Sequence, residues 1–142
     1  MIKAVGAALA VAGLAACSTG ISSGGNTPTA SLTVQSSYRA TYEAATAQAE
    51  RCLRGEGAYK VHGTVDDAAR TALVRVEAPF TGDDVARVTI TGQGERQSQV
   101  DIVMWGRGIW NENAVRAMRA AVIYEVPSCT TYMPTEVPKP KK

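Results

Sequence analysis

Few side chains in this sequence carry the chemistry of a catalytic or metal site. His62 is the only histidine, and no cysteine or carboxylate accompanies it at a spacing typical of metal ligands. The chain contains neither a G-x-S-x-G nor an H-E-x-x-H motif, so the sequence gives no support to a Ser-His-Asp triad or a zinc protease. We therefore interpret His62 as an ordinary strand histidine and predict no metal, cofactor or catalytic residue.

Two pairs of acidic residues, Asp66-Asp67 and Asp83-Asp84, are the next candidates for cation binding or acid–base catalysis. Both pairs lie between segments that are expected to be strands. Aspartate favours turns because its side chain forms hydrogen bonds with the local backbone. The pairs are therefore interpreted as turn residues.

Trp105, Arg107 and Trp110 form the strongest candidate for a partner-binding surface. Tryptophan and arginine are enriched at binding hot spots, and the glycines between them favour an exposed corner. The alternative is that one or both indoles cap the small core, because only 6% of the residues are aromatic and a core needs its few large side chains. Composition favours this second interpretation, and both remain open.

Cys17 ends an apolar run that follows Lys3, an arrangement typical of an exported protein. Residues 4–16 carry no charge and fall short of the roughly 20 residues that a spanning helix needs. The tetrapeptide Leu14-Ala15-Ala16-Cys17 resembles the lipobox of bacterial lipoproteins. This resemblance implies that residues 1–16 are a signal peptide and that Cys17 is acylated, which makes a membrane the first predicted partner.

The residue after the acylated cysteine is Ser18 rather than aspartate. In a Gram-negative cell, the sorting pattern of lipoproteins implies transfer to the periplasmic face of the outer membrane. Each buried methylene contributes about 0.8 kcal/mol, so several acyl chains would hold the protein on a leaflet without a spanning segment. The predicted location is therefore the cell envelope.

Once Cys17 is acylated, two cysteines remain, Cys52 and Cys129. An exported protein enters an oxidising compartment, where two such cysteines favour a disulfide. A redox or catalytic pair would more often have C-x-x-C spacing or a nearby histidine. The sequence therefore predicts a structural disulfide between the ends of two helices.

The spacing of apolar residues predicts two helices and four strands. A helix begins at Ser36 or Ser37, continues through Cys52 and ends before Gly55, and a second covers residues 111–124. Alternating apolar and polar residues predict strands over residues 59–64, 71–78, 85–91 and 97–105, joined by short turns. The expected fold class is α+β in the order α-β-β-β-β-α, with both helices on one face of a four-stranded antiparallel meander.

The predicted domain organisation follows from these elements. Residues 17–36 combine the acylated cysteine with a stretch rich in Ser, Thr and Gly, which we interpret as a flexible tether spanning roughly 25 Å. A single domain covers residues 37–133, and residues 134–142 form a basic tail rich in proline and lysine. Cleavage removes only Lys3 from 15 basic residues against 13 acidic ones, so no nucleic-acid partner is expected.

Beyond the lipobox, the chain resembles small proteobacterial envelope lipoproteins that have no assigned activity. Its order of elements is also similar to that of accessory lipoproteins of outer-membrane assembly and of secretion pilotins, an analogy at the level of fold. The predicted tether, the disulfide and the lack of a catalytic motif favour a non-enzymatic, lipid-anchored module that binds or stabilises another envelope component. An enzyme or a small-ligand carrier acting on cell wall or lipid is the alternative.

Overall fold

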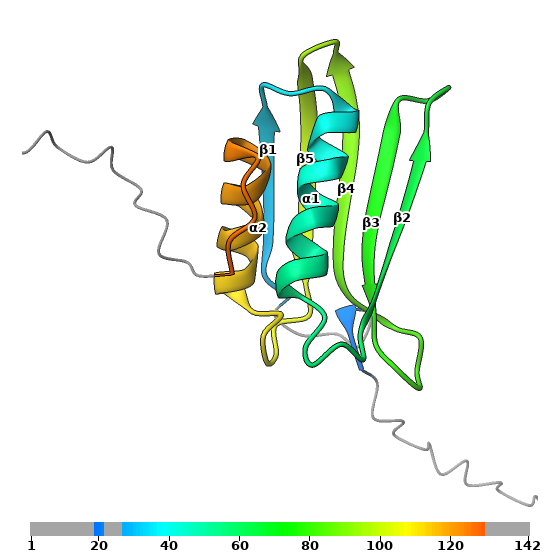
Figure 1. The fold of residues 1–142 in the computed structure, drawn as a ribbon, viewed down its shortest axis with the longest axis vertical. Helices are drawn as coiled ribbons and strands as arrows, with labels where there is room; N and C mark the ends of the chain where they lie inside the picture. The colour runs from blue at the N-terminus through cyan, green and yellow to red at the C-terminus, as the bar shows by residue number, and fades with distance from the viewer. Residues whose placement is uncertain (1–18, 22–26, 130–142) are drawn as a thin grey trace, which may run out of the picture.

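The fold is α+β and has two layers, a five-stranded antiparallel sheet and two helices that lie on the same face of it (Figure 1). The computed structural model describes residues 19–21 and 27–129. The elements, in chain order, are β1 (Thr29–Val34), α1 (Tyr38–Cys52), β2 (Lys60–Asp66), β3 (Thr71–Glu77), β4 (Asp84–Gly94), β5 (Gln97–Met104) and α2 (Glu112–Tyr124).

Strand β1 corrects the predicted four-stranded sheet, and it occupies residues 29–34 of the segment that was interpreted as a tether. It forms one edge of the sheet and pairs antiparallel with β5. Ala30, Leu32 and Val34 alternate with serine and threonine, which is the pattern of a strand with one apolar face. The sequence interpretation missed the strand because the pattern is short and lies in a Ser/Thr-rich stretch. Only its last residue, Val34, is buried.

Strands β2 to β5 form the predicted antiparallel meander, and the sheet order is β1-β5-β4-β3-β2. Val74 and Val76 in β3, like Ile102 and Met104 in β5, point toward the helices and are almost fully buried. Helix α1 packs on β3 and β4, whereas α2 packs on β1 and β5. The predicted two-layer arrangement with one apolar sheet face is confirmed.

Both helices begin at the predicted residues. The Ser37 hydroxyl accepts a hydrogen bond from the Ala40 N–H at 3.1 Å, and the Asn111 side chain accepts one from the Ala114 N–H at 3.0 Å. Each bond satisfies one of the N–H groups that a helix start leaves without an intrahelical partner. The buried face of α2 contains Val115, Met118 and Val122, which recur at helical spacing.

Gly63 in β2 allows α1 to approach this edge of the sheet. A Cβ atom at Gly63 would overlap the hydroxyl group of Tyr42, which extends from α1. Any larger residue would force the tyrosine ring or the strand to move. The sequence therefore uses a glycine in the strand for packing rather than for a turn.

The segment after α2 is fastened to α1 by two neighbouring contacts. Cys52 and Cys129 form the predicted disulfide, with 5.1 Å between their Cα atoms. One turn earlier on α1, the buried Gln48 side chain donates to the Ser128 carbonyl at 2.7 Å and accepts from the Ser128 N–H at 2.8 Å. The amide thus pairs with the backbone of Ser128 as a neighbouring strand would.

Candidate functional site

Trp110 belongs to the core rather than to a binding surface. Its side chain is buried, and its Nε1–H donates to the Leu53 carbonyl at 2.9 Å. Its ring also packs against Tyr59, with 4.2 Å between ring centroids. The core interpretation of the tryptophan corner is therefore correct for this indole.

Trp105 and Arg107 remain together at the surface. The Arg107 guanidinium lies over the half-buried Trp105 ring, 5.9 Å from its centroid, and Arg107 itself is exposed. Backbone hydrogen bonds from Gly106 N–H to the Trp110 carbonyl and from Trp110 N–H to the Arg107 carbonyl close the turn. The corner therefore offers one arginine and part of one indole for contact.

His62 lies on β2, and Glu77 on β3 is its partner. The Nε2 atom of His62 is 3.1 Å from the Glu77 Oε2 atom. The pair could not be predicted from the sequence because it depends on the strand register, in which His62 faces Arg75 and Glu77 lies diagonally across. Over residues 19–21 and 27–129, no group of three or more His, Cys, Asp or Glu side chains is placed to bind a metal ion.

The first acidic pair helps to hold the β2–β3 turn. The Asp66 carboxylate accepts a hydrogen bond from Ala69 N–H at 3.1 Å, as expected for a turn residue. Asp67 accepts a hydrogen bond from the Tyr38 hydroxyl at 2.7 Å and pairs with Arg39, both at the start of α1. The bond with Tyr38, and then the Arg39 charge, hold the pKa of the Asp67 carboxyl below its ordinary value. The same bond raises the pKa of Tyr38.

The second pair leads to a site that sequence reasoning did not identify. Asp84 is the first residue of β4, and its carboxylate accepts hydrogen bonds from two arginines. One is Arg75 Nη1 at 2.8 Å, and the other is Arg87, through Nε at 3.1 Å and Nη2 at 2.7 Å. The Asp84 side chain is only 8% exposed, whereas those of Arg75 and Arg87 are 35% and 45% exposed. The carboxylate therefore orients two accessible guanidinium groups.

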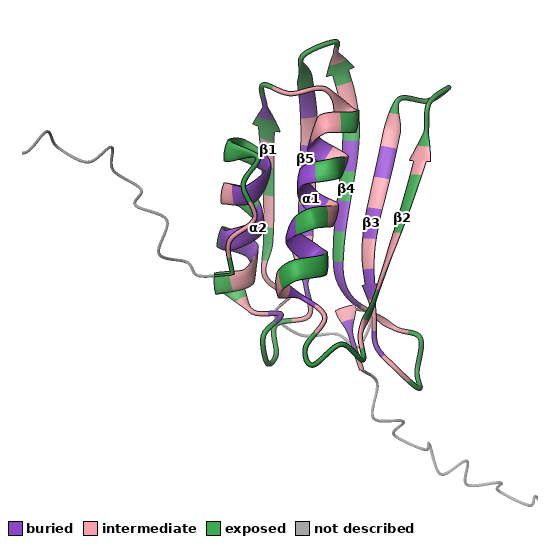
Figure 2. Cartoon of the chain, viewed as in Figure 1, coloured by how far each residue is buried: buried purple, intermediate pink, exposed green. Residues whose placement is uncertain are grey.

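These side chains lie on the face of the sheet opposite the helices, which we call the open face. Figure 2 shows buried residues alternating with accessible ones along the strands, as expected for a sheet that is covered on one side. Arg75 and Arg87 are direct cross-strand neighbours in the pairing of β3 with β4. Two like charges at such positions repel each other, and the Asp84 carboxylate between them offsets the repulsion.

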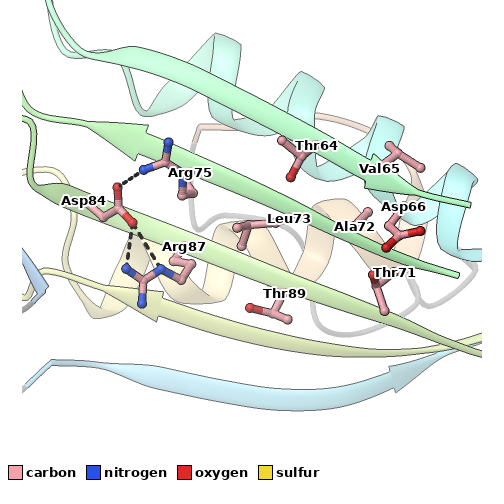
Figure 3. A pocket seen from close by; sticks show the side chains of 10 residues that line it. All are labelled: Thr64, Val65, Asp66, Thr71, Ala72, Leu73, Arg75, Asp84, Arg87 and Thr89. Atoms are coloured by element: carbon pink, nitrogen blue, oxygen red, sulfur yellow. Dashed lines mark hydrogen bonds and ion pairs between the residues drawn. The ribbon is translucent and has the colours of Figure 1, made fainter. Parts of the chain in front are cut away.

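A shallow groove of about 680 Å³ runs across the open face over β2, β3 and β4. Figure 3 shows the arginine pair at one end of this groove and threonine side chains toward the other. Besides Asp84, the polar side chains that line the groove are Thr64, Asp66, Thr71, Arg75, Arg87 and Thr89, and Leu73 adds an apolar surface. We refer to it as the Arg75–Arg87 groove.

The two halves of the open face differ in how their hydroxyl groups are used. On β1, Ser31 donates to Asp101 and Thr33 donates to Gln99, so these polar groups are paired within the sheet. In the groove, the hydroxyl groups of Thr64, Thr71 and Thr89 have no hydrogen-bond partner within the described part of the chain. The groove thus combines available hydroxyls, an apolar patch at Leu73 and, at one end, two cations that share one anion, with the Asp66 carboxylate toward the other end (Figure 3).

No protein-family model matches the chain, and no curated protein matches it either. Cys17 and residues 130–142, which include the predicted basic tail, lie outside the described residues. Neither described helix is both long and apolar enough to cross a bilayer.

Proposed function

We propose that this protein is a lipid-anchored, non-enzymatic envelope module that binds an anionic carbohydrate of the envelope on its open face. The observation that carries the proposal is the pair of guanidinium groups held side by side by Asp84, with 2.8 Å from Arg75 Nη1 and 2.7 Å from Arg87 Nη2 to the carboxylate. An arginine presents five N–H donors in a planar fork that matches carboxylate and phosphate groups. Asp84 engages only part of these donors.

The rest of the groove suits a carbohydrate. Threonine hydroxyls can exchange hydrogen bonds with sugar hydroxyls, and the half-exposed Leu73 supplies an apolar surface for a ring. The two arginines and Asp84 leave one net positive charge at the end of the groove, which favours an anionic group there. Carboxylates of peptidoglycan and phosphates of lipopolysaccharide are the two envelope sources of such a group.

The lipid anchor is tested by the replacement of Cys17 with serine. Acylation requires the thiol, so the wild-type protein should incorporate a palmitate analogue and sediment with membranes, whereas Cys17→Ser should do neither. The measurement is metabolic labelling followed by membrane fractionation, with Cys52→Ser/Cys129→Ser as a control that retains Cys17. Equal labelling of wild type and Cys17→Ser would rule out lipidation at this residue.

The binding site is tested by the double variant Arg75→Gln/Arg87→Gln. Hydrogen bonds to charged groups contribute about 1.5–3 kcal/mol each, so the loss of both cations should weaken binding at least about tenfold. The measurements are co-sedimentation with purified peptidoglycan sacculi and binding to lipopolysaccharide micelles, both with the detergent-solubilised acylated protein. Binding to only one of these would identify the source of the anion.

The matched control is Arg116→Gln/Arg119→Gln, which removes the same charge from exposed positions on α2. Glutamine can still donate a hydrogen bond to Asp84, and the single variant Arg87→Gln keeps the contact between Arg75 and Asp84. Thermal melting would show whether each variant is folded. If folded groove and control variants bind both carbohydrates equally, or if the wild type binds neither, the proposed function is wrong.

A further inference from the structure

The turn between β3 and β4 presents a phenylalanine to solvent. Phe80 has a relative exposure of 106%, so its neighbours cover none of its side chain. Its φ angle is +70°, and the Thr81 N–H donates to the Pro79 carbonyl at 2.9 Å across it. These features define a γ-turn of the rare type with a positive central φ, which bulky residues seldom adopt.

The turn around Phe80 is nevertheless well held. Ala78 N–H donates to the Asp83 carbonyl at 2.8 Å, and Gly82 N–H donates to the Ala78 carbonyl at 3.1 Å. Ala78 itself is buried. The backbone of the turn is therefore fixed to the domain, and the phenyl ring at its tip is held away from the core.

The described residues nearest to Cys17 lie against the same turn. Gly20 is buried, has a φ of +98°, and a Cβ atom placed on it would be 2.5 Å from the Asp84 carbonyl oxygen and 3.0 Å from the Asp83 Cβ. Figure 1 shows residues 19–21, in blue, at the end of the sheet where this turn lies. Thr19 is two residues after Cys17, a distance of at most about 7 Å along an extended chain.

We propose that Phe80 inserts into the membrane leaflet that holds the acyl chains of Cys17. This inference rests on the lipid anchor in the proposed function and adds the orientation of the domain. A link of at most about 7 Å keeps the β3–β4 turn at the headgroups, where a phenyl ring lowers its free energy by leaving water. Lys60 and Glu77 line the same surface hollow as Phe80. A lysine close to the membrane surface attracts anionic headgroups.

The loop between β5 and α2 lies at the same end of the domain (Figure 1). It carries Ile109, which is 45% exposed, and the exposed Arg107. Contact of this end with lipid would direct the strands away from the membrane. The plane of the sheet would then be roughly perpendicular to the membrane surface. The Arg75–Arg87 groove on the open face would stay accessible to ligands in the periplasm.

The orientation is tested with a fluorophore attached to an introduced cysteine. In the acylated protein Cys17 is blocked and Cys52 is paired with Cys129, so Thr81→Cys supplies one reactive thiol next to Phe80. The matched control is Gln93→Cys. Gln93 is exposed and lies near the end of β4 that is farther from the β3–β4 turn. Each labelled protein is reconstituted into vesicles of phosphatidylethanolamine and phosphatidylglycerol that contain a spin-labelled lipid.

We expect the label at position 81 to be quenched several-fold more strongly than the label at position 93. Phe80→Ser should weaken the quenching at position 81. Gly20→Val should weaken it too, because a side chain at φ +98° meets the Asp84 carbonyl and would release residues 19–21 from the turn. The vesicle-bound fraction should stay unchanged in both variants, because the acyl chains remain.

Two results separate the failure of this inference from that of the proposed anchor. A mass spectrum without acyl groups, together with a protein that does not bind vesicles, would refute the anchor. An acylated, vesicle-bound protein whose labels at positions 81 and 93 are quenched equally would overturn the orientation alone. Unchanged quenching in Phe80→Ser would likewise overturn the role of the phenyl ring.

Discussion

Replacement of Trp110 with alanine should lower the free energy of unfolding by about 3–5 kcal/mol, the range for a large aromatic residue removed from a core. Trp110 is 6% exposed, packs against Tyr59 and donates to the Leu53 carbonyl from Nε1. The substitution would leave a cavity and would remove the partner of a buried carbonyl group. Urea unfolding followed by circular dichroism measures the loss without relying on tryptophan fluorescence.

Arg107→Ala is the matched control for Trp110→Ala, because both residues belong to the same turn. Arg107 is exposed, so its truncation should change the free energy of unfolding by about 0.5 kcal/mol or less. A large loss in Arg107→Ala would show that the arginine supports the fold. A loss below about 1 kcal/mol in Trp110→Ala would contradict the assignment of this indole to the core.

Loss of the disulfide between Cys52 and Cys129 should destabilise the domain by about 4 kcal/mol, because the bond closes a loop of 77 residues. This is a large share of the roughly 5–15 kcal/mol that stabilises a typical domain. The expected effect comes mainly from the unfolded chain, which gains freedom when the crosslink is removed. Cys52→Ala/Cys129→Ala should therefore unfold at a lower urea concentration than the oxidised wild type.

The control for the disulfide prediction is the reduced wild-type protein, which should unfold close to the double alanine variant. Thiol titration of the denatured, unreduced chain without its first 17 residues should find no free cysteine. Two free thiols in that experiment would refute the disulfide in the purified protein. Equal stability of the oxidised and reduced forms would refute its proposed contribution to folding.

The helices and four of the strands could be predicted because their signals are local. Ser37 and Asn111 are good N-cap residues followed by apolar residues at helical spacing, and both do begin helices. The alternation in β3 and β5 identified the buried face correctly. Strand β1 was missed because its identity depends on pairing with β5, and its own six residues are mostly accessible.

The candidate site was harder to predict because it depends on register. Asp84 pairs with Glu77, while the next pair is Ala86 with Val76, so a bulge shifts the register between the two strands. Counting back from the turn without this bulge does not place Arg75 opposite Arg87. The tryptophan corner, in contrast, was visible as a composition, but composition does not reveal that Trp110 points inward.

The pairing of β1 with β5 also has a consequence for biogenesis. Thr29 pairs with Val103, so the first strand of the sheet can pair only after the last has been supplied. A chain threaded through an export channel from its amino terminus would emerge with β1 first. It could not complete the sheet until β5 (Gln97–Met104) had followed, or the disulfide until Cys129 had followed. Long-range pairing of this kind slows folding and leaves strands exposed in the meantime. With the lipid anchor that we propose at Cys17, a chain acylated before β5 emerged would assemble its domain while already tied to the membrane surface.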